Sequence, residues 1–208
     1  MNLTKSKLAI ILSRLNDFNE SILKLEQYST PSEIAADICW KAFMAGDVEN
    51  KIILDAACGP GYFGIACLLL GAKKVYFVDI DEKAIDILKS NLNLIQLKNK
   101  RIEKRYSIIK SDISEFNEKV DVVIQNPPFG TKQKHADKIF LENAFKVSKT
   151  IYSMHKIESE KFIKAIAKDH NFEITGYWEY DLLLKKTQKF HKKKKHYIKV
   201  GCWKLKKE

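Results

Sequence analysis

The chain has 208 residues, a formal net charge of +11 at pH 7 and 45% hydrophobic residues. This length and composition suit a single domain, residues 1–208, with a sizeable core. Its four cysteines lack Cys-x-x-Cys spacing and its five histidines are scattered, so we expect reduced thiols and no metal site. No signal peptide opens the sequence and no apolar run approaches membrane-spanning length, so we expect a cytoplasmic protein with no membrane contact.

Two helices are expected in the first 45 residues. Apolar residues recur at helical spacing over residues 8–18, which predicts an amphipathic helix packed on the domain. A second helix should run to about residue 45. Thr30 is predicted to be its N-cap, Pro31 its first helical residue, and Glu33 the partner that completes a capping box.

A strand over residues 51–55, a glycine turn over 56–64 and a helix over 65–70 follow one another. This order is typical of a cofactor-binding unit, because glycines let the backbone approach a bound cofactor. Ala57 stands where a dinucleotide-binding turn would have its first glycine, and we expect this small residue to keep cofactor binding. The departure argues against a nicotinamide enzyme, as does the lack of a hydride-transfer partner further along the chain.

A carboxylate ends the next strand, residues 75–79. Asp79 follows Gly61 by eighteen residues, close to the distance of about 20 at which dinucleotide-binding folds place an acid on a ribose. We therefore predict that Asp79 binds the ribose hydroxyls of a nucleoside cofactor. Asp81 is a competing candidate, but its place beyond the strand end favours an N-cap of the next helix.

Strands and helices alternate through the rest of the chain, and two long alternating stretches close it. This pattern predicts an α/β, Rossmann-like fold with a seven-stranded, mostly parallel sheet, helices on both faces and an antiparallel last strand. The N-terminal helical segment (1–45) adds to it, and residues 185–208 form a lysine-rich rim and the last strand. The other expected strands cover residues 106–110, 120–124, 151–154, 172–184 and 197–205, and the other expected helices cover 82–95, 137–149 and 158–170.

In a parallel sheet, ligands bind outside the carboxyl ends of the strands. Residues 55–61, Asp79, Asp112 and Asn126 all fall at such ends, so we expect them to converge on one cleft. The lysine-rich connection leaves the carboxyl end of the sixth strand and should lie on the same rim. This placement would link the charge of the chain to its chemistry.

A buried-looking strand runs into Asn126-Pro127-Pro128-Phe129, the candidate catalytic turn. A planar exocyclic amine, such as that of adenine, is a poor nucleophile because its lone pair is delocalised into the ring. The Asn126 side-chain oxygen and the Pro127 carbonyl can accept its two N–H groups, and Phe129 can stack on the ring. A turn that merely ends a strand is the alternative, and the cofactor-binding pattern upstream favours the chemical interpretation.

Residues 185–207 contain eleven lysines and no acid, and with Glu208 they carry +10 of the formal +11. Aromatic residues and histidines are interleaved with these lysines. This mixture suits a phosphate backbone with unstacked bases and favours a nucleic-acid surface over a merely solvated face. The residues expected to contact RNA are Phe190, His191, Lys192, Lys193, Lys194 and Lys195.

The glycine turn, the strand-end acid and the Asn-Pro-Pro-Phe turn together resemble class I S-adenosylmethionine-dependent methyltransferases that act on amines. Motifs along essentially the whole chain are similar to those of the methyltransferase-like protein 5 family. These archaeal and eukaryotic enzymes methylate adenine N6 in small-subunit ribosomal RNA. The motifs occupy residues 26–31, 126–131, 135–137, 152–156 and 190–194.

The resemblance implies S-adenosylmethionine as cofactor, with Gln27 and Thr30 closing over it and Asp112 holding its adenine amine. Tyr152 and His155 could touch the substrate, although a strand-end tyrosine and a satisfied histidine are equally compatible with the sequence. Family members often work with a small zinc-containing activator protein that covers a sheet edge. The expected cofactor-binding set is Gln27, Thr30, Asp55, Ala57, Gly59, Pro60, Gly61, Tyr62, Asp79, Asp112 and Asn126.

Three other functions stay open on the sequence. A glutamine side-chain amide is also a planar NH2 group, so a protein-glutamine methyltransferase is one alternative. A non-catalytic RNA-binding assembly factor on the same fold is another, although such a protein need not keep Asn126 or Asp79. DNA as substrate is the third, because no residue visibly reads a 2′-hydroxyl.

Overall fold

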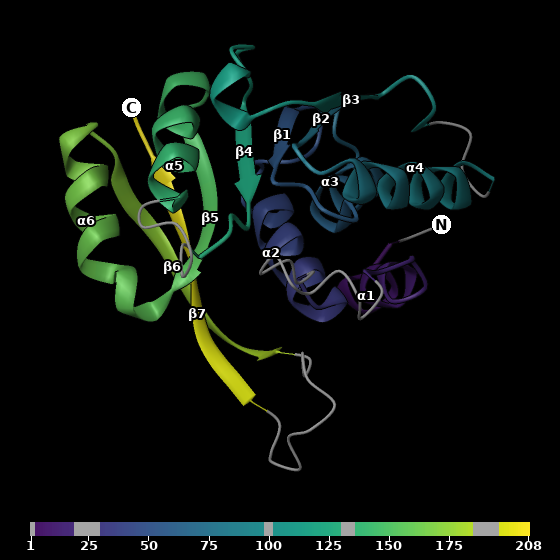
Figure 1. The fold of residues 1–208 in the computed structure, drawn as a ribbon, viewed down its shortest axis with the longest axis horizontal. Coiled ribbons are helices and arrows are strands. Elements are labelled where there is room, and N and C mark those ends of the chain that lie inside the picture. The colour runs from purple at the N-terminus through teal and green to yellow at the C-terminus, as the bar shows by residue number, and fades with distance from the viewer. Residues whose placement is uncertain (1–2, 19–29, 98–101, 130–135, 185–195) are drawn as a thin grey trace.

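The computed structural model of the chain describes residues 3–18, 30–97, 102–129, 136–184 and 196–208. The strands are β1 (Ile52–Ala56), β2 (Lys74–Asp79), β3 (Tyr106–Lys110), β4 (Val122–Gln125), β5 (Thr150–Lys156), β6 (Glu173–Leu184) and β7 (His196–Lys206). They form one seven-stranded sheet in the order β3-β2-β1-β4-β5-β7-β6 (Figure 1). The first five strands pair in parallel, and β7 runs antiparallel to its neighbours β5 and β6. The predicted Rossmann-like sheet with an antiparallel last strand is confirmed.

Helices cover both faces of this sheet. They are α1 (Lys5–Leu12), α2 (Ser32–Met44), α3 (Tyr62–Leu69), α4 (Glu82–Gln96), α5 (Ala136–Val147) and α6 (Glu160–Asp169), with short 3-10 turns η3 (Ile113–Glu115) and η4 (Ile157–Ser159). Helices α1 to α4 share one apolar cluster with Ile53, Phe77 and Ile124 of the sheet. Helices α5 and α6 share a second cluster, on the opposite face, with Leu54 and Val123. The alternation of side chains along β1 and β4 therefore fills two cores.

The register of the parallel strands brings the predicted site residues to one edge. Ala56 pairs with Val78 of β2 and with Gln125 of β4. Asp79 and Asn126 come directly after these partners. The glycine turn that follows Ala56 therefore leaves the sheet between Asp79 and Asn126. Because neighbouring strands are about 4.8 Å apart, the three features share one small region.

The ribbon made by β6 and β7 extends past this edge. The pairing of β5 with β7 reaches Lys156 and Val200, whereas the pairing of β6 with β7 continues to Leu184 and His196. Because β6 runs parallel to β1, Leu184 lies on the carboxyl side of the sheet (Figure 1). The two ends of the lysine-rich connection are thus on the predicted rim, and the connection itself, residues 185–195, lies outside the described residues.

The start of α2 differs from the prediction. Pro31, not Thr30, is the N-cap, and it makes no side-chain cap hydrogen bond. The Thr30 hydroxyl instead accepts a hydrogen bond from Asn126 Nδ2 at 3.0 Å. Glu33 accepts from the hydroxyl of Ser32 at 3.1 Å, so the predicted capping box is wrong. The Thr30 hydroxyl, which local rules assign to the helix cap, therefore makes a long-range hydrogen bond instead.

The first helix is shorter than predicted, since α1 ends at Leu12 rather than near residue 18. The four cysteines are free and buried, as expected. In the described part of the chain, no helix is long and apolar enough to cross a membrane. The same residues contain no group of three or more His, Cys, Asp or Glu side chains that could hold a metal ion.

Candidate cofactor and substrate site

Glycine shapes the turn after β1. Gly61, directly before α3, has a φ of +86°, which glycine adopts without strain. A Cβ on Gly61 would lie 2.3 Å from Leu88 Cδ1 of α4, so the turn lies too close to that helix for a side chain. Ala57 has a φ of +54° and thus takes the conformation of the glycine that it replaces, which costs about 1–2 kcal/mol. The turn therefore keeps a glycine-like backbone despite the substitution.

Asp55 anchors the start of α3. Its side chain is buried, and its Oδ2 accepts the Gly64 N–H at 2.8 Å. Gly64 packs so closely on Phe77 that an added Cβ would lie 2.2 Å from the ring. Burial raises the pKa of Asp55 well above its usual range. Its Oδ1 is buried and has no hydrogen-bond partner among the described residues, so one acceptor is left over beside the turn.

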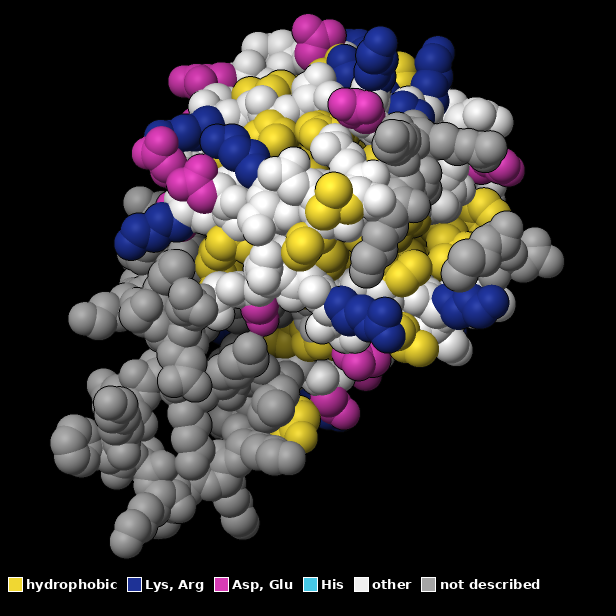
Figure 2. Space-filling model, turned by 90° about the vertical axis from the view of Figure 1, so that its right-hand side faces the viewer, with side chains coloured by type: hydrophobic (Ala, Val, Ile, Leu, Met, Phe, Trp, Pro, Cys, Tyr) yellow, Lys and Arg dark blue, Asp and Glu magenta, His cyan; other side chains and the backbone are white. Residues whose placement is uncertain are grey.

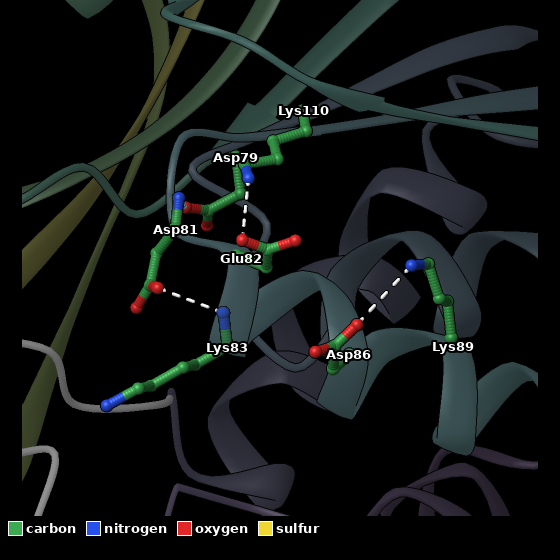
Figure 3. Close-up of polar contacts among 7 residues, drawn as sticks. All are labelled: Asp79, Asp81, Glu82, Lys83, Asp86, Lys89 and Lys110. Atoms are coloured by element: carbon green, nitrogen blue, oxygen red, sulfur yellow. Dashed lines mark hydrogen bonds and ion pairs between the residues drawn. The ribbon is translucent and has the colours of Figure 1, made fainter.

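Asp79 ties the end of β2 to the glycine turn. Its Oδ2 accepts the Gly59 N–H at 2.8 Å, and its Oδ1 accepts the Asp81 N–H at 3.0 Å. Burial raises the pKa of Asp79, and these two hydrogen bonds oppose the rise. Figure 3 shows the carboxylate beside the start of α4, where Asp81 accepts the Lys83 N–H at 3.0 Å. The N-cap prediction for Asp81 is confirmed, and Asp79 stays the candidate ribose ligand.

Two residues beside Asp79 complete this end of the site. Asp112, exposed after β3, accepts the N–H and the hydroxyl of Ser114 on Oδ1 at 2.8 and 2.6 Å, which lowers its pKa. Ile80, directly after Asp79, is 67% exposed. The sequence analysis missed Ile80, although an apolar residue immediately after a strand-end acid was a usable signal. Its exposed side chain offers an apolar face next to two carboxylates.

Asn126 lies on the other side of the glycine turn, after β4. Its Nδ2 donates to Thr30 Oγ1, and its Oδ1 is buried with no hydrogen-bond partner in the described part of the chain. Pro127 is buried, Pro128 is exposed, and Phe129 is half-buried against the core cluster of α1 to α4. Thr30 thus fixes one end of the amide, and the other end presents an acceptor.

The N-terminal segment packs on the glycine turn through a contact that the sequence analysis missed. Asn91 of α4 is fully buried, and its Oδ1 accepts the Asn16 N–H at 2.7 Å. Its Nδ2 donates to the carbonyls of Asn16 and Pro60, both at 3.0 Å. The Phe18 ring lies 3.6 Å from the position of a Cβ on Gly59. The sequence carried one signal for this contact: Asn91, a polar residue, stands three residues after Leu88 on the apolar face of α4.

Tyr152 and His155 do not face the substrate side. Each is 1% exposed. The Tyr152 hydroxyl donates to Asp47 Oδ2 at 2.7 Å, and His155 Nε2 lies 2.6 Å from Ser153 Oγ. The expectation that they touch the substrate is wrong, because β5 lies inside the sheet and both rings point into its two cores.

Several predicted contacts lie outside the described residues and stay predictions. These are Gln27 for the cofactor, and Phe190, His191, Lys192, Lys193, Lys194 and Lys195 for RNA.

A strand-end acid and a glycine turn on this strand order, followed by an Asn-Pro-Pro-Phe turn, place the fold among class I S-adenosylmethionine-dependent methyltransferases. Residues 34–153 match the family described as "Methyltransferase small domain". The rRNA N6-adenosine-methyltransferase METTL5 of Danio rerio is 33% identical over 91% of this chain and 92% of its own. The Drosophila melanogaster protein of the same name is 32% identical over 96% and 94%.

A solved structure agrees with these relatives. A candidate RNA methyltransferase from Pyrococcus horikoshii superposes with a TM-score of 0.87 at 38% identity, over 100% of this chain and 99% of its own. The chain belongs to the methyltransferase small domain family and, within it, to the methyltransferase-like protein 5 family. Its cofactor is S-adenosylmethionine.

The residues at this edge fit that cofactor. S-adenosylmethionine carries an ammonium group and a ribose diol, which are hydrogen-bond donors, and Asp55 Oδ1 is a buried acceptor without a partner among the described residues. Each Asp79 oxygen accepts one backbone N–H and keeps a second lone pair. When bound, the cofactor supplies a methyl group activated by a sulfonium.

Proposed function

We propose that the protein methylates the exocyclic N6 amine of an unstacked adenosine in RNA, and that this RNA is the small-subunit ribosomal RNA. The observation that carries the proposal is the amide of Asn126. Its Nδ2 is bound by Thr30 at 3.0 Å, and its buried Oδ1 has no partner among the described residues. Such an acceptor matches the N–H group of a planar amine. The activity for which the METTL5 relatives are named supports the choice of adenosine and of ribosomal RNA.

The residues of the turn have separate tasks in this reaction. Asn126 Oδ1 and the Pro127 carbonyl accept the two N–H groups of the amine, which localises its lone pair on nitrogen. Phe129, half-buried, holds the adenine ring by stacking. When bound, the cofactor would supply the methyl group that this nitrogen takes up, and the amine would lose one proton to solvent. Orientation and electrostatics therefore supply most of the catalysis.

The cofactor is held on the β2 side of the turn. Asp79 would accept from the ribose hydroxyls, and Asp112 from the adenine amine. Ile80 directly follows Asp79 at the end of β2, which pairs with β3, and its 67% exposed side chain would pack on the adenine face. The backbone of residues 57–61 and Asp55 Oδ1 would face the amino-acid end of the cofactor. This arrangement leaves Asn126, across the glycine turn, free for the target base.

RNA is expected to approach from the rim formed by β6 and β7. Of the eleven lysines beyond residue 184, seven belong to the connection 185–195, whereas Lys204, Lys206 and Lys207 lie toward the start of β5, at the other end of the sheet. Residues 1–184 are nearly balanced, at +1. Figure 2 agrees with this balance, because acidic and basic side chains are interspersed on the face that it shows. The target adenosine must leave its stack to reach Asn126, and the basic, aromatic-rich segment suits the unstacked strand around it.

A small zinc-containing activator protein is part of the proposal. The strand β3 forms one edge of the sheet, so its outer side can pair with a strand of a partner. Co-expression with the activator should raise the soluble yield and the activity. Unchanged yield and activity would show that the protein works alone.

A parallel transfer assay tests the substrate class. Labelled S-adenosylmethionine is incubated with undermethylated small-subunit RNA in one tube and with release-factor protein in another, each with wild type and Asn126→Ala. Label in the RNA, lost in the variant, is the expected result. Label in the protein tube would identify a glutamine methyltransferase. No label in either tube, with the activator present, would leave a binding-only role.

A further inference from the structure

A buried chain of polar contacts begins next to the Asn-Pro-Pro-Phe turn. Gln125 Nε2 donates to Ser153 Oγ at 2.9 Å, and Ser153 Oγ lies 2.6 Å from His155 Nε2. These three side chains are 1%, 0% and 1% exposed. On the other side of the imidazole, Nδ1 lies 3.6 Å from Asp137 Oδ2. The contacts join β4, β5 and α5 in one line.

The charge of Asp137 determines which group donates and which accepts along this line of polar contacts. At 3.6 Å the carboxylate is beyond hydrogen-bond distance, but it favours a proton on Nδ1. Burial lowers the pKa of His155, against the effect of Asp137, so the ring is neutral at pH 7. Nε2 is then an acceptor and takes the proton of the Ser153 hydroxyl. The Ser153 oxygen is left to accept from Gln125, so each group has one defined role.

We propose that His155 is a positioning residue that fastens both ends of the segment carrying the Asn-Pro-Pro-Phe turn. Gln125 directly precedes Asn126, and Asp137 lies in the first turn of α5, which follows the segment. Both converge on the same imidazole, one through Ser153 and the other through its charge. The inference rests on the proposed function, because the task of the turn is to orient the target amine.

The end of β5 holds the turn at a third point. Lys156, directly after His155, places its Nζ 5.9 Å from the centroid of the Phe129 ring, within the range of a cation–π contact. His155, which is buried, and Lys156, which is half-buried, are thus consecutive residues of β5 that both support the turn. Catalysis by orientation is sensitive to such supports, since a displacement of about 1 Å can lower a rate by about a hundred-fold.

The contact chain shares no hydrogen bond with the cofactor side of the site. Asp55 and Asp79 bond to the glycine turn and to the start of α4, and among the described residues no hydrogen bond or ion pair joins either side chain to β5. A weakened turn should therefore lower kcat for methyl transfer and leave the affinity for S-adenosylmethionine unchanged. General destabilisation would not separate these two quantities.

Four variants of the full-length protein isolate the contribution of these polar contacts. His155→Leu removes both polar contacts of the ring, and Ser153→Ala removes the link with a smaller change. His155→Gln places an amide oxygen near the position of Nε2 and can still accept from Ser153. Ser148→Ala is the matched control: Ser148 is also buried and donates to the Asp121 carbonyl at 2.9 Å, but it precedes the amino end of β5.

Three quantities are measured for each variant: kcat on RNA at saturating S-adenosylmethionine, the dissociation constant for the cofactor from a titration, and hydrogen exchange of residues 125–137. We expect His155→Leu and Ser153→Ala to lower kcat about ten-fold or more, with cofactor affinity within about two-fold of wild type and faster exchange in that segment. His155→Gln should recover most of the loss. Ser148→Ala should leave kcat, cofactor affinity and the exchange of residues 125–137 near their wild-type values.

Unchanged kcat and exchange in Ser153→Ala and His155→Leu would overturn the inference. An equal loss in Ser148→Ala, or a parallel loss of cofactor affinity, would also overturn it by showing a general effect on folding. Failure of the wild type to methylate RNA is a separate outcome that sinks the proposed function. The exchange of residues 125–137 still decides in that case whether His155 fastens the segment.

Discussion

Asn126→Ala should lower methyl transfer by about 10²-fold or more without destabilising the fold. The side chain makes one hydrogen bond, from Nδ2 to Thr30 Oγ1 at 3.0 Å, and its Oδ1 is buried with no partner in the described residues. In the free protein this oxygen carries a desolvation penalty that only a bound donor relieves. The alanine variant loses the bond and the penalty together.

The two effects can be weighed. A hydrogen bond of this kind contributes about 0.5–1.5 kcal/mol, and a buried polar atom without a partner costs about 1–3 kcal/mol. The free energy of unfolding should therefore lie between about 0.5 kcal/mol below and about 2.5 kcal/mol above that of wild type. Methyl transfer should fall by about 10²- to 10³-fold or more, as when one preorganised group is removed from a site of this type.

Urea unfolding and single-turnover methyl transfer are the assays. Asn143→Ala is a matched control, since Asn143 of α5 also donates one hydrogen bond, to the Phe116 carbonyl at 2.9 Å, and also has a buried Oδ1 without a partner among the described residues. The control should keep its activity. An Asn126→Ala variant that is less stable than wild type by more than about 1 kcal/mol would refute the reasoning, because its Oδ1 would then have been satisfied.

Three further results are expected. Gly64→Ala should lose about 1–3 kcal/mol in urea unfolding despite the better helix propensity of alanine, because the new Cβ would lie 2.2 Å from the Phe77 ring; unchanged stability would contradict this packing. Because burial lowers the pKa of His155 below its usual 6.5, the unfolded chain binds the proton first as the pH falls. The free energy of unfolding should therefore decrease more steeply in wild type than in His155→Gln as the pH falls below about 6.5. Parallel curves for the two proteins would show that the folded state does not hold the imidazole neutral. Replacing Lys192 to Lys195 with alanine should flatten the salt dependence of RNA binding by up to about 0.9 in log–log slope per lost phosphate contact on a duplex, whereas an unchanged slope would make these lysines a solvated surface.

The fold could be predicted because its signals are local and periodic. The strands around Asp55, Asp79 and Asn126 read as short apolar runs, and each ends in a polar residue at a turn. In a parallel sheet, strand ends meet at one edge, so the neighbourhood of these residues followed from their place in the elements. Asp81 as N-cap of α4 followed from the same local rules.

Contacts between distant segments could not be predicted in the same way. Thr30 fits a helix cap by local rules, yet its hydroxyl meets Asn126, 96 positions further on. On the sequence, Tyr152 and His155 could touch the substrate, but Tyr152 packs in the apolar cluster of α1 to α4 and His155 against Trp203, so both are buried. Asn91 reaches 75 positions back to Asn16, which sequence periodicity alone does not reveal. Polar pairings across the core depend on the final packing of elements rather than on any one of them.

The position of the methyl group tests the central claim most directly. Undermethylated small-subunit RNA is incubated with S-adenosylmethionine and either wild type or Asn126→Ala, digested to nucleosides and separated by mass spectrometry. The account predicts N6-methyladenosine as the product of wild type, formed about 10²-fold or more slowly by the variant. Methylation of another atom or base, or equal N6-methyladenosine from both proteins, would contradict the role assigned to Asn126 and its turn.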